Sequence, residues 1–563
     1  MLKGIGASDG IGIGKALKLE EKPIVYEDTA AANPAAERER LAAAVQTFCE
    51  KSEARAAQMD ASGADGEILR GHVAMLSDPY MLSQMNERID SGACAEKAVE
   101  TVCDTFIAAF SATDDELTRQ RATDVEDIKK QVQKILLGIE DVHLDHLPPD
   151  TVLIVDELTP SMAAEMDRAH VVGIVSERGG RTSHSAIISR SLKIPAVLGV
   201  EDALTRISSG KELIVDGSTG EVYTDFDGAT RARLVEAQKR YAEKAALEEK
   251  YRGKPTITKD GITKKLYANI GSHKDLEAVL EGDAEGIGLF RTEFLFMDRD
   301  TMPTEEEQFE AYKAVAAGMR GREVIIRTLD VGGDKNVPYL HLKKEENPFM
   351  GFRAVRYCLA NCDAYKVQLR AILRASAFGD VAVMVPLVTR VDEIRTVRAM
   401  IDVLKDELDV QNIPYKKDIK IGIMVETPAA CLIADLLAEY ADFFSIGTND
   451  LTGYVMAADR GNADVSYLYS ALDPAVLRAI QYIIASATKR GIPCGMCGEA
   501  AADPRMLPLL VSFGLEEFSV SPASVLSVRC ALSALDRKAC DAIAEKALSM
   551  ETEEEVSAYL SSL

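Results

Sequence analysis

The hydrophobic pattern changes along the chain and predicts several regions of different structure. Residues 34–142 place apolar side chains three and four residues apart within long stretches of Ala, Glu, Arg, Lys and Leu, which predicts a helical subdomain. Four short apolar runs then alternate with helical pieces and glycine turns, at residues 151–155, 171–177, 195–200 and 212–217. This alternation predicts an α/β domain over 143–228, to which we assign the glycine-rich residues 1–33 as well.

A second α/β pattern fills the C-terminal half. Residues 229–255 interleave charges with few large apolar residues, and they predict a solvated linker helix that ends at the RGKP segment. Eight apolar runs follow, at residues 264–270, 286–292, 324–330, 381–388, 421–427, 443–450, 493–499 and 516–522. Seven of the eight precede a helix-like segment or a long excursion, so residues 256–563 predict a (β/α)₈ barrel with its active site at the C-terminal ends of the strands.

Composition excludes several classes of partner. The 563 residues carry 65 Lys and Arg against 90 Asp and Glu, a net charge of −25, which argues against nucleic acid or an anionic membrane and favours a basic partner. No apolar run approaches the ~20 residues of a membrane span, and the N-terminus resembles no signal or transit peptide. With ten scattered cysteines and no disulfide-like density, we expect a soluble, cytoplasmic protein.

Polar side chains stand late in the predicted barrel strands. They are Arg291, Arg327, Glu426, Asn449, Asp450, Cys497 and Glu499. Strand ends are polar in any barrel because loops begin there, so each residue alone has a structural explanation. Together they would meet at one face, where Arg291, Arg327 and the nearby Arg460 suit phosphate or carboxylate oxygens. The hard oxygens of Glu426 and Asp450 favour Mg²⁺ over zinc.

Cys494 and Cys497 have the spacing of a redox or metal pair. No second CxxC motif or nearby histidine completes a zinc site, and the pair lies in a strand rather than before a helix, which disfavours redox use. An acid–base thiol at Cys497 and simple packing remain open.

A second group of polar residues lies at GGRTSHSAIISRSLKIPAVLG, residues 179–199. Two glycines permit a tight turn, after which His184 leads into a predicted helix. A helix N-terminus offers free N–H groups, which would hold a phosphoryl group carried on His184. A hydrogen-bonded structural histidine is the alternative.

These motifs resemble those of the enzyme I family of the bacterial sugar phosphotransferase system. The phosphohistidine signature is similar to residues 179–199, and the barrel signatures are similar to GIGLFRTEFLFMDRDTMPTEEEQF, RTLDVGGDK, KEENPFMGFRAVR, QLRAILRASAFG, MVETPAA, FFSIGTNDLT, DRGN and GMCGE. The match covers essentially the whole chain. Residues 34–142 are the least distinctive part.

The resemblance implies roles for individual residues. It implies that His184 is the phosphorylated nucleophile, that Cys497 protonates the enolate carbon, and that Glu426 and Asp450 hold Mg²⁺. It implies that phosphoenolpyruvate is bound by Arg291, Arg327, Asn449, Asp450, Arg460, Lys335 and Arg353. Two departures stand out: Ala163 replaces a threonine that would orient the histidine ring, and Gly453 replaces a glutamine in the substrate loop.

The resemblance also implies partners and motion. The acceptor would be a histidine of the phosphocarrier protein HPr, docking on residues 34–142, where GHVAMLSDPY (71–80) mixes apolar and acidic residues. Residues such as Met75 and Leu76 have core packing as their alternative role. The barrel would form a homodimer, and the linker helix with its ends would let the histidine domain swing onto the barrel and away.

Three other functions remain as alternatives. A phosphoenolpyruvate synthase or pyruvate phosphate dikinase shares the phosphohistidine domain and barrel, but it needs an ATP-binding domain, and we find no P-loop. A regulatory phosphorelay paralogue typically carries an extra sensory domain. A plain lyase or aldolase barrel leaves the GGRTSH motif unexplained.

Overall fold

The computed structural model describes residues 1–19, 24–26, 33–61, 66–111, 116–139, 144, 147–159, 162, 163, 166–180, 184–297, 299, 301–332 and 337–563. The chain folds into two compact units, Met1–Ala245 and Ala246–Leu563. Each unit has its own hydrophobic core. Within the described part, no helix is both long and apolar enough to cross a membrane.

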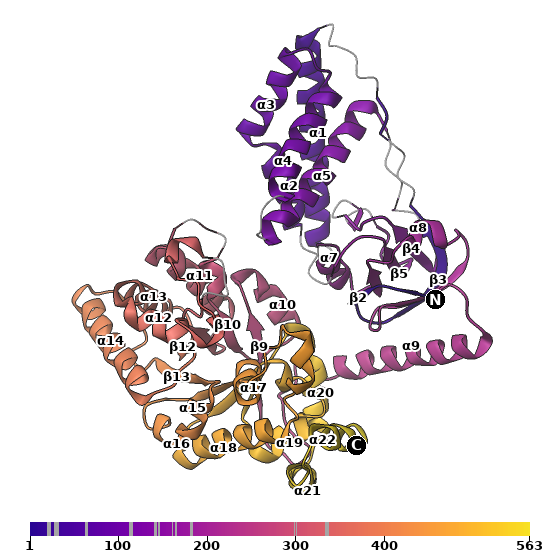
Figure 1. The fold of residues 1–563 in the computed structure, drawn as a ribbon. Helices are drawn as coiled ribbons and strands as arrows, with labels where there is room; N and C mark the ends of the chain where they lie inside the picture. The colour runs from indigo at the N-terminus through magenta and orange to yellow at the C-terminus, as the bar shows by residue number, and fades with distance from the viewer. Residues whose placement is uncertain are drawn as a thin grey trace. The chain divides into compact units, whose positions relative to one another are not determined.

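The predicted helical region of the first unit is confirmed (Figure 1). Its helices are α1 (Pro34–Ala61), α2 (Glu67–Leu76), α3 (Pro79–Asp90), α4 (Ala95–Ser111) and α5 (Glu116–Leu137). Asp78 starts α3 by accepting hydrogen bonds from the backbone N–H groups of Tyr80 and Met81, with a proline next in the chain. Leu76 is fully buried in this helical core, so core packing, the alternative considered above, is correct for it.

The same unit contains an eight-stranded sheet in the order β1-β8-β7-β3-β4-β5-β6-β2. The strands are β1 (Leu2–Lys3), β2 (Ile5–Ser8), β3 (Ile11–Lys18), β4 (Thr151–Val155), β5 (Val171–Ser176), β6 (Ala196–Leu198), β7 (Glu212–Asp216) and β8 (Glu221–Tyr223). The four predicted apolar runs are β4 to β7. The central strand β3 was not predicted as a strand, because glycines interrupt its apolar pattern; a side chain at Gly12 would clash with the carbonyl oxygen of Val172.

Helices complete this unit and lead out of it. Helices α7 (His184–Leu192) and α8 (Ala203–Arg206) accompany the sheet, and α9 (Gly228–Glu249) corresponds to the predicted linker helix. Leu234 of α9 is buried, and Gln238 donates a hydrogen bond to the backbone oxygen of Ile11 at 2.8 Å. Most other α9 side chains are exposed, and the boundary between the two units falls inside this helix.

The second unit is a closed barrel of eight parallel strands, which confirms the predicted (β/α)₈ fold (Figure 1). Its strands are β9 (Lys265–Ile270), β10 (Ile287–Arg291), β11 (Val324–Arg327), β12 (Val381–Val385), β13 (Lys420–Val425), β14 (Phe444–Gly447), β15 (Cys494–Cys497) and β16 (Glu517–Val520). They pair in sequence order, and β16 closes on β9. Each of the eight predicted runs coincides with a strand, although β13 begins one residue before its run.

Helices surround the barrel strands. They are α10 (Leu276–Glu281), α11 (Glu305–Gly318), α12 (Ala354–Ala360), α13 (Cys362–Ala375), α14 (Val391–Val410), α15 (Pro428–Leu432), α16 (Ala434–Leu437), α17 (Thr448–Met456), α18 (Pro474–Arg490), α19 (Leu507–Phe513), α20 (Val525–Ala534), α21 (Arg537–Leu548) and α22 (Glu553–Ser561). One boundary differs from the prediction: Asn449 and Asp450 do not end a strand but lie in the first turn of α17, because the chain turns into a helix directly after Gly447.

Candidate active site

Two arginines end neighbouring strands of the barrel. Arg291 is the last residue of β10 and Arg327 the last of β11, and the two pair in register. The buried Arg327 guanidinium contacts Glu293 Oε1 at 2.6 Å and Asp330 Oδ2 at 3.1 Å. Burial lowers the pKa of Arg327, but the carboxylates of Glu293 and Asp330 outweigh it, so the pKa is raised and the side chain keeps its positive charge.

Arg353 extends this network of buried charges. Its Nε and Nη2 atoms donate to Asp330 Oδ1 at 3.2 and 2.8 Å, and Nη2 lies 4.0 Å from Asp450 Oδ2. Arg353 Nη1 and Arg327 Nε are buried and have no hydrogen-bond partner among the described residues. Since a buried donor without a partner is costly, these two N–H groups fit an anionic ligand that completes their hydrogen bonds.

Glu426 directly follows β13 and is 1% exposed. Its Oε1 accepts a hydrogen bond from the backbone N–H of Leu387 at 2.6 Å. Burial raises the pKa of this carboxyl well above its ordinary value, and the charge of Asp450 raises it further. A bound cation would relieve this repulsion, so the pair fits a divalent metal with oxygen ligands.

No group of three or more His, Cys, Asp or Glu side chains in the described ranges is arranged to hold an ion. Two carboxylates completed by substrate and water oxygens are typical of Mg²⁺ sites.

Cys497 ends β15 and is 4% exposed. Its Sγ accepts a hydrogen bond from Ser445 Oγ at 3.4 Å and donates to the backbone oxygen of Ile446 at 3.8 Å. Burial raises the pKa of the Cys497 thiol to about 11, although the Ser445 hydrogen bond and the positive charge of Arg327 oppose that rise. The thiol therefore holds its proton at neutral pH, as an acid must. Cys494 and Cys497 are both free thiols.

A cavity of about 410 Å³ opens beside these groups. It is lined by Glu346, Asn347, Pro348, Phe349, Met350, Asn449, Asp450, Gly453, Tyr454, Ala457, Ala458, Asp459, Arg460 and Tyr469. The structure thus brings the predicted residues Asn449, Asp450 and Arg460 together. The Tyr454 hydroxyl donates to the backbone oxygen of Phe349, which ties the 348–350 turn to α17.

The histidine motif lies in the first unit. His184 is the first residue of α7, and the hydroxyl of Ser185 donates to the backbone oxygen of Leu158 at 3.0 Å, which holds the start of the helix against the segment after β4. The His184 side chain, residues 181–183 and the predicted substrate ligand Lys335 lie outside the described part of the structure.

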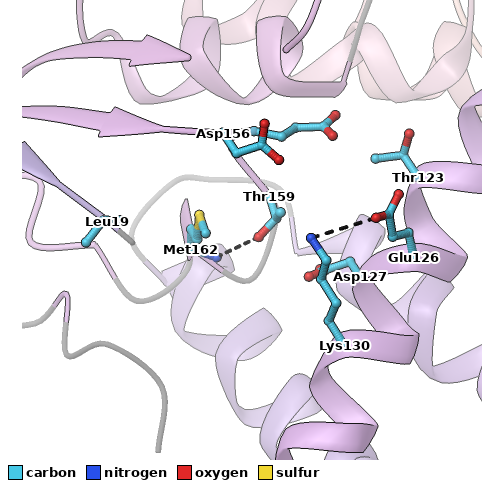
Figure 2. Close-up of a pocket in the computed structure, with 9 residues that line it drawn as sticks. Leu19, Thr123, Glu126, Asp127, Lys130, Asp156, Thr159 and Met162 are labelled. Atoms are coloured by element: carbon cyan, nitrogen blue, oxygen red, sulfur yellow. Dashed lines mark hydrogen bonds and ion pairs between the residues drawn. The ribbon is translucent and has the colours of Figure 1, made fainter. Parts of the chain in front are cut away.

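A small pocket adjoins that segment (Figure 2). Side chains of α5 face the segment after β4 across this pocket. That segment contributes Asp156, Glu157 and Thr159. The pocket is lined by Leu19, Thr123, Glu126, Asp127, Lys130, Asp156, Glu157, Thr159 and Met162. The Thr159 hydroxyl accepts a hydrogen bond from the backbone N–H of Met162 at 3.3 Å.

Ala163, the first of the two departures, is fully buried next to this pocket. Thr159, on the same segment, lies in a local turn, whereas Thr182, two residues before His184, lies outside the described residues.

Sequence reasoning missed three members of the barrel network. Glu293 and Asp330 hold the arginines, and Ser445 holds the thiol. Glu293 and Asp330 follow β10 and β11 by two or three residues, so the rule used for the other strand ends could have found them. Ser445 lies inside a strand and gave no such signal.

Models of one enzyme family match most of the chain. Three family models match: "PEP-utilising enzyme, N-terminal" over residues 3–121, "PEP-utilising enzyme, mobile domain" over 147–220, and "PEP-utilising enzyme, PEP-binding domain" over 245–537. The phosphoenolpyruvate-protein phosphotransferase of Bacillus subtilis (strain 168) is 42% identical over 562 residues, covering 99% of each chain.

Two further relatives bear the same name. The protein of Geobacillus stearothermophilus is 43% identical over 99% of this chain and 97% of its own, and that of Staphylococcus carnosus (strain TM300) is 41% identical over the same shares. These relatives match from end to end, and the dikinase-like alternative is not favoured. The chain belongs to the PEP-utilising enzymes, and within them to the family of phosphoenolpyruvate-protein phosphotransferases.

Proposed function

We propose that this chain moves the phosphoryl group of phosphoenolpyruvate to His184 and then to a histidine of HPr, releasing pyruvate, as the first step of sugar uptake. The observation that carries the proposal is the barrel network: buried guanidinium N–H groups that have no partner within the described ranges stand beside the Glu426–Asp450 pair and a protonated thiol. An anion would complete the hydrogen bonds of the guanidinium groups, a cation would neutralise the carboxylate pair, and a proton acceptor would take the proton of the thiol. Phosphoenolpyruvate with a metal supplies all three.

The substrate phosphate and carboxylate would be held by side chains of the barrel. We assign this role to Arg291, Arg327, Arg353, Arg460, Asn449, Asp450 and Lys335. Enzymes of this family need a divalent metal. We propose Mg²⁺, held by Glu426 and Asp450, which would neutralise charge on the transferring group.

The chemistry then divides between the two units. The bond between phosphorus and the enol oxygen breaks as a bond from phosphorus to the His184 ring nitrogen forms, which leaves the enolate of pyruvate. The Cys497 thiol gives its proton to the enolate carbon, and this step makes the transfer hard to reverse. Because His184 belongs to the first unit and Cys497 to the second, we propose a swing about the helix α9 and its ends.

We assign a function to each region of the chain. Residues 1–33 and 143–228 would form the phosphohistidine domain, 229–255 the linker and 256–563 the phosphoenolpyruvate-binding barrel. Residues 34–142 would bind HPr. The ten cysteines are scattered over the chain without the density of a disulfide scaffold, and we propose the reducing cytoplasm as the compartment.

An aromatic surface supports HPr binding by the helical region. Tyr80 of α3 is 65% exposed and packs edge-on against Phe106 of α4, with ring centroids 6.4 Å apart, and Phe106 neighbours Phe110 at 6.1 Å. Such a surface on a chain of net charge −25 suits a small basic partner.

The barrel carries exposed apolar side chains that favour dimerisation. Leu432 of α15, Leu436 of α16 and Tyr482 of α18 are 75%, 50% and 45% exposed, and these three helices contact one another. Leucines so exposed on adjacent helices are typical of a protein interface, so we propose a homodimer through this face.

Labelling with phosphoenolpyruvate tests the function. Incubation with ³²P-phosphoenolpyruvate and Mg²⁺ should give an acid-labile, base-stable phosphoprotein, and HPr should remove the label. The variant His184→Gln should take up none. His170→Gln, which alters a histidine of the same unit that contacts Asp167, is the matched control and should label normally. Label retained in His184→Gln would show that another residue is the nucleophile.

A further inference from the structure

A buried glutamine binds the two segments that follow β10 and β11. Gln368 lies in α13, the helix before β12, and is 1% exposed. Its Oε1 atom accepts a hydrogen bond from the backbone N–H of Leu329 at 2.9 Å, and its Nε2 atom donates to Thr292 Oγ1 at 3.1 Å. Thr292 directly follows β10, and Leu329 lies two residues after β11. One side chain therefore joins the ends of two neighbouring strands.

The partners of Gln368 define the direction of each hydrogen bond. A backbone N–H can only donate, so the oxygen of the Gln368 amide faces Leu329 and the nitrogen faces Thr292. The Thr292 hydroxyl in turn donates to the backbone oxygen of Arg327 at 2.8 Å. Gln368 Nε2 also donates to the Tyr312 hydroxyl of α11 at 3.2 Å. Every polar atom of the Gln368, Thr292 and Tyr312 side chains is thus paired, which makes this buried network rigid.

The network holds the two strands together beyond their backbone ladder. The parallel pairing of β10 with β11 ends at Arg291 and Arg327. Thr292 has helical dihedral angles, φ −86° and ψ −14°, so the chain leaves the sheet there. From that point the Thr292–Arg327 hydrogen bond and the Gln368 amide join the two segments. The backbone that carries both arginines is therefore held by side-chain hydrogen bonds as well as by the sheet.

The same network reaches the carboxylates that hold the guanidinium groups. Glu293 contacts Arg327 at 2.6 Å, and Asp330 contacts it at 3.1 Å. Asp330 also contacts Arg353 at 2.8 Å. Each of these carboxylates directly follows a residue that Gln368 binds. Loss of the Gln368 hydrogen bonds would therefore let both carboxylates move, and the guanidinium groups with them.

Helix α13 supports the end of β11 with a second side chain. The Tyr365 hydroxyl donates to Thr328 Oγ1 at 3.2 Å, and Thr328 directly follows Arg327. Tyr365 and Gln368 are three residues apart, so they lie on the same face of the helix, and both are buried. This face of α13 therefore presents polar groups to the strand ends, whereas the core-facing stripe of a helix is usually apolar.

We propose that Gln368 is a positioning residue for phosphoenolpyruvate, which holds Arg291 and Arg327 at the separation that suits the substrate anion. Its amide is engaged by protein partners, so it acts through Thr292 and Leu329 and does not touch the substrate. A misplacement of about 1 Å in a binding group can cost about 10²-fold in rate, so these hydrogen bonds matter to the reaction. This inference rests on the proposed function, because it needs the arginines to bind phosphoenolpyruvate.

The variant Gln368→Met tests this role. Methionine is a flexible side chain that fills core space, and its thioether is at most a weak acceptor. In the full-length protein, the phosphoenolpyruvate concentration for half-maximal His184 labelling should rise by at least about tenfold. The rate at saturating phosphoenolpyruvate should change much less, because the arginines bind the ground state as well as the transition state.

Gln308→Met is the matched control. Gln308 of α11 is also a fully buried glutamine, and its Oε1 accepts a hydrogen bond from the same Tyr312 hydroxyl at 3.2 Å. Its Nε2 donates to the backbone oxygen of Pro303 at 3.0 Å, so Gln308 holds the start of α11 instead of the strand ends. Both variants leave buried partners unsatisfied and should lower the Tm. Only Gln368→Met should raise the half-maximal phosphoenolpyruvate concentration.

A second variant decides the question if Gln368→Met folds poorly. Thr292→Val keeps the branched shape of the side chain and removes the hydroxyl that links Gln368 Nε2 to the backbone oxygen of Arg327. It should also raise the half-maximal phosphoenolpyruvate concentration. The double variant should show a smaller rise than the product of the two single rises, because both substitutions break the same chain of hydrogen bonds.

Two results would overturn the inference. One is an unchanged dependence on phosphoenolpyruvate in a folded Gln368→Met or Thr292→Val. The other is an equal shift in Gln308→Met, which would assign Gln368 to the general packing of the barrel. Failure of the unchanged protein to label His184 would instead contradict the proposed function.

Discussion

The buried carboxyl of Glu517 should make the stability of the barrel depend on pH. In the unfolded chain this group ionises near its ordinary pKa of 4.5, whereas burial holds the pKa in the folded barrel at about 8. Between these values the unfolded state binds fewer protons, so the free energy of unfolding falls as pH rises and levels off above pH 8. The contribution of Glu517 to the free energy of unfolding is therefore fully present only below pH 4.5.

The variant Glu517→Gln removes this dependence. Its amide is neutral in both states, so the variant should be more stable than the unchanged protein wherever the unfolded Glu517 would ionise. One pH unit corresponds to about 1.4 kcal/mol, so the difference should grow from about 1 kcal/mol at pH 5.5 to about 4 kcal/mol at pH 8. For a unit the size of Ala246–Leu563 this is a rise in Tm of roughly 2 °C growing to roughly 6 °C.

Scanning calorimetry of the full chain measures this difference. The chain has no tryptophan for a fluorescence assay, and calorimetry can separate the transitions of its two units. Glu516→Gln, at the exposed neighbouring position, should show no pH-dependent offset. A Tm difference for Glu517→Gln that stays constant from pH 5.5 to 8 would refute the argument, because it would show that Glu517 is already ionised in the folded barrel.

Three other predictions concern the site and the assembly. Glu426→Gln should raise the Mg²⁺ concentration needed for the half-maximal rate of labelling by at least about 100-fold. An unchanged Mg²⁺ dependence would reject Glu426 as a ligand. Cys497→Ser should slow pyruvate formation by about 10²-fold or more in a coupled assay while His184 is still labelled, and an unaffected rate would leave the thiol a packing role. Leu432→Glu should shift the protein from dimer to monomer in light scattering, whereas the exposed Val410→Glu should not; dimers in both would place the interface elsewhere.

Much of the barrel was predictable because its strands are buried on both faces. A run such as Val381–Val385 is apolar throughout, and each of the eight runs ends where polar residues begin. The C-terminal ends of all strands in a parallel barrel lie at the same face. The polar residues at those ends, Arg291, Arg327 and Glu426, could therefore be predicted as site residues.

The remaining features depend on contacts that no local pattern encodes. Glu517 is the first residue of an ordinary strand, and only the folded barrel shows that its carboxyl lies against Gly288 and Gly495. Leu76 lies in a segment of mixed polarity, and helix packing alone decides that it is buried. Strand β3 was not predicted because its glycines interrupt the apolar pattern. Those glycines are required by the close approach of neighbouring backbone, which the sequence pattern does not show.

The central claim is that His184 carries the phosphoryl group between phosphoenolpyruvate and a second protein. Mass spectrometry of the protein, quenched under alkaline conditions after mixing with phosphoenolpyruvate and Mg²⁺, tests it most directly. The account predicts one added phosphate on the peptide that contains His184 and its loss within a single turnover when HPr is added. Phosphate found only on another peptide, or none at all, would contradict it.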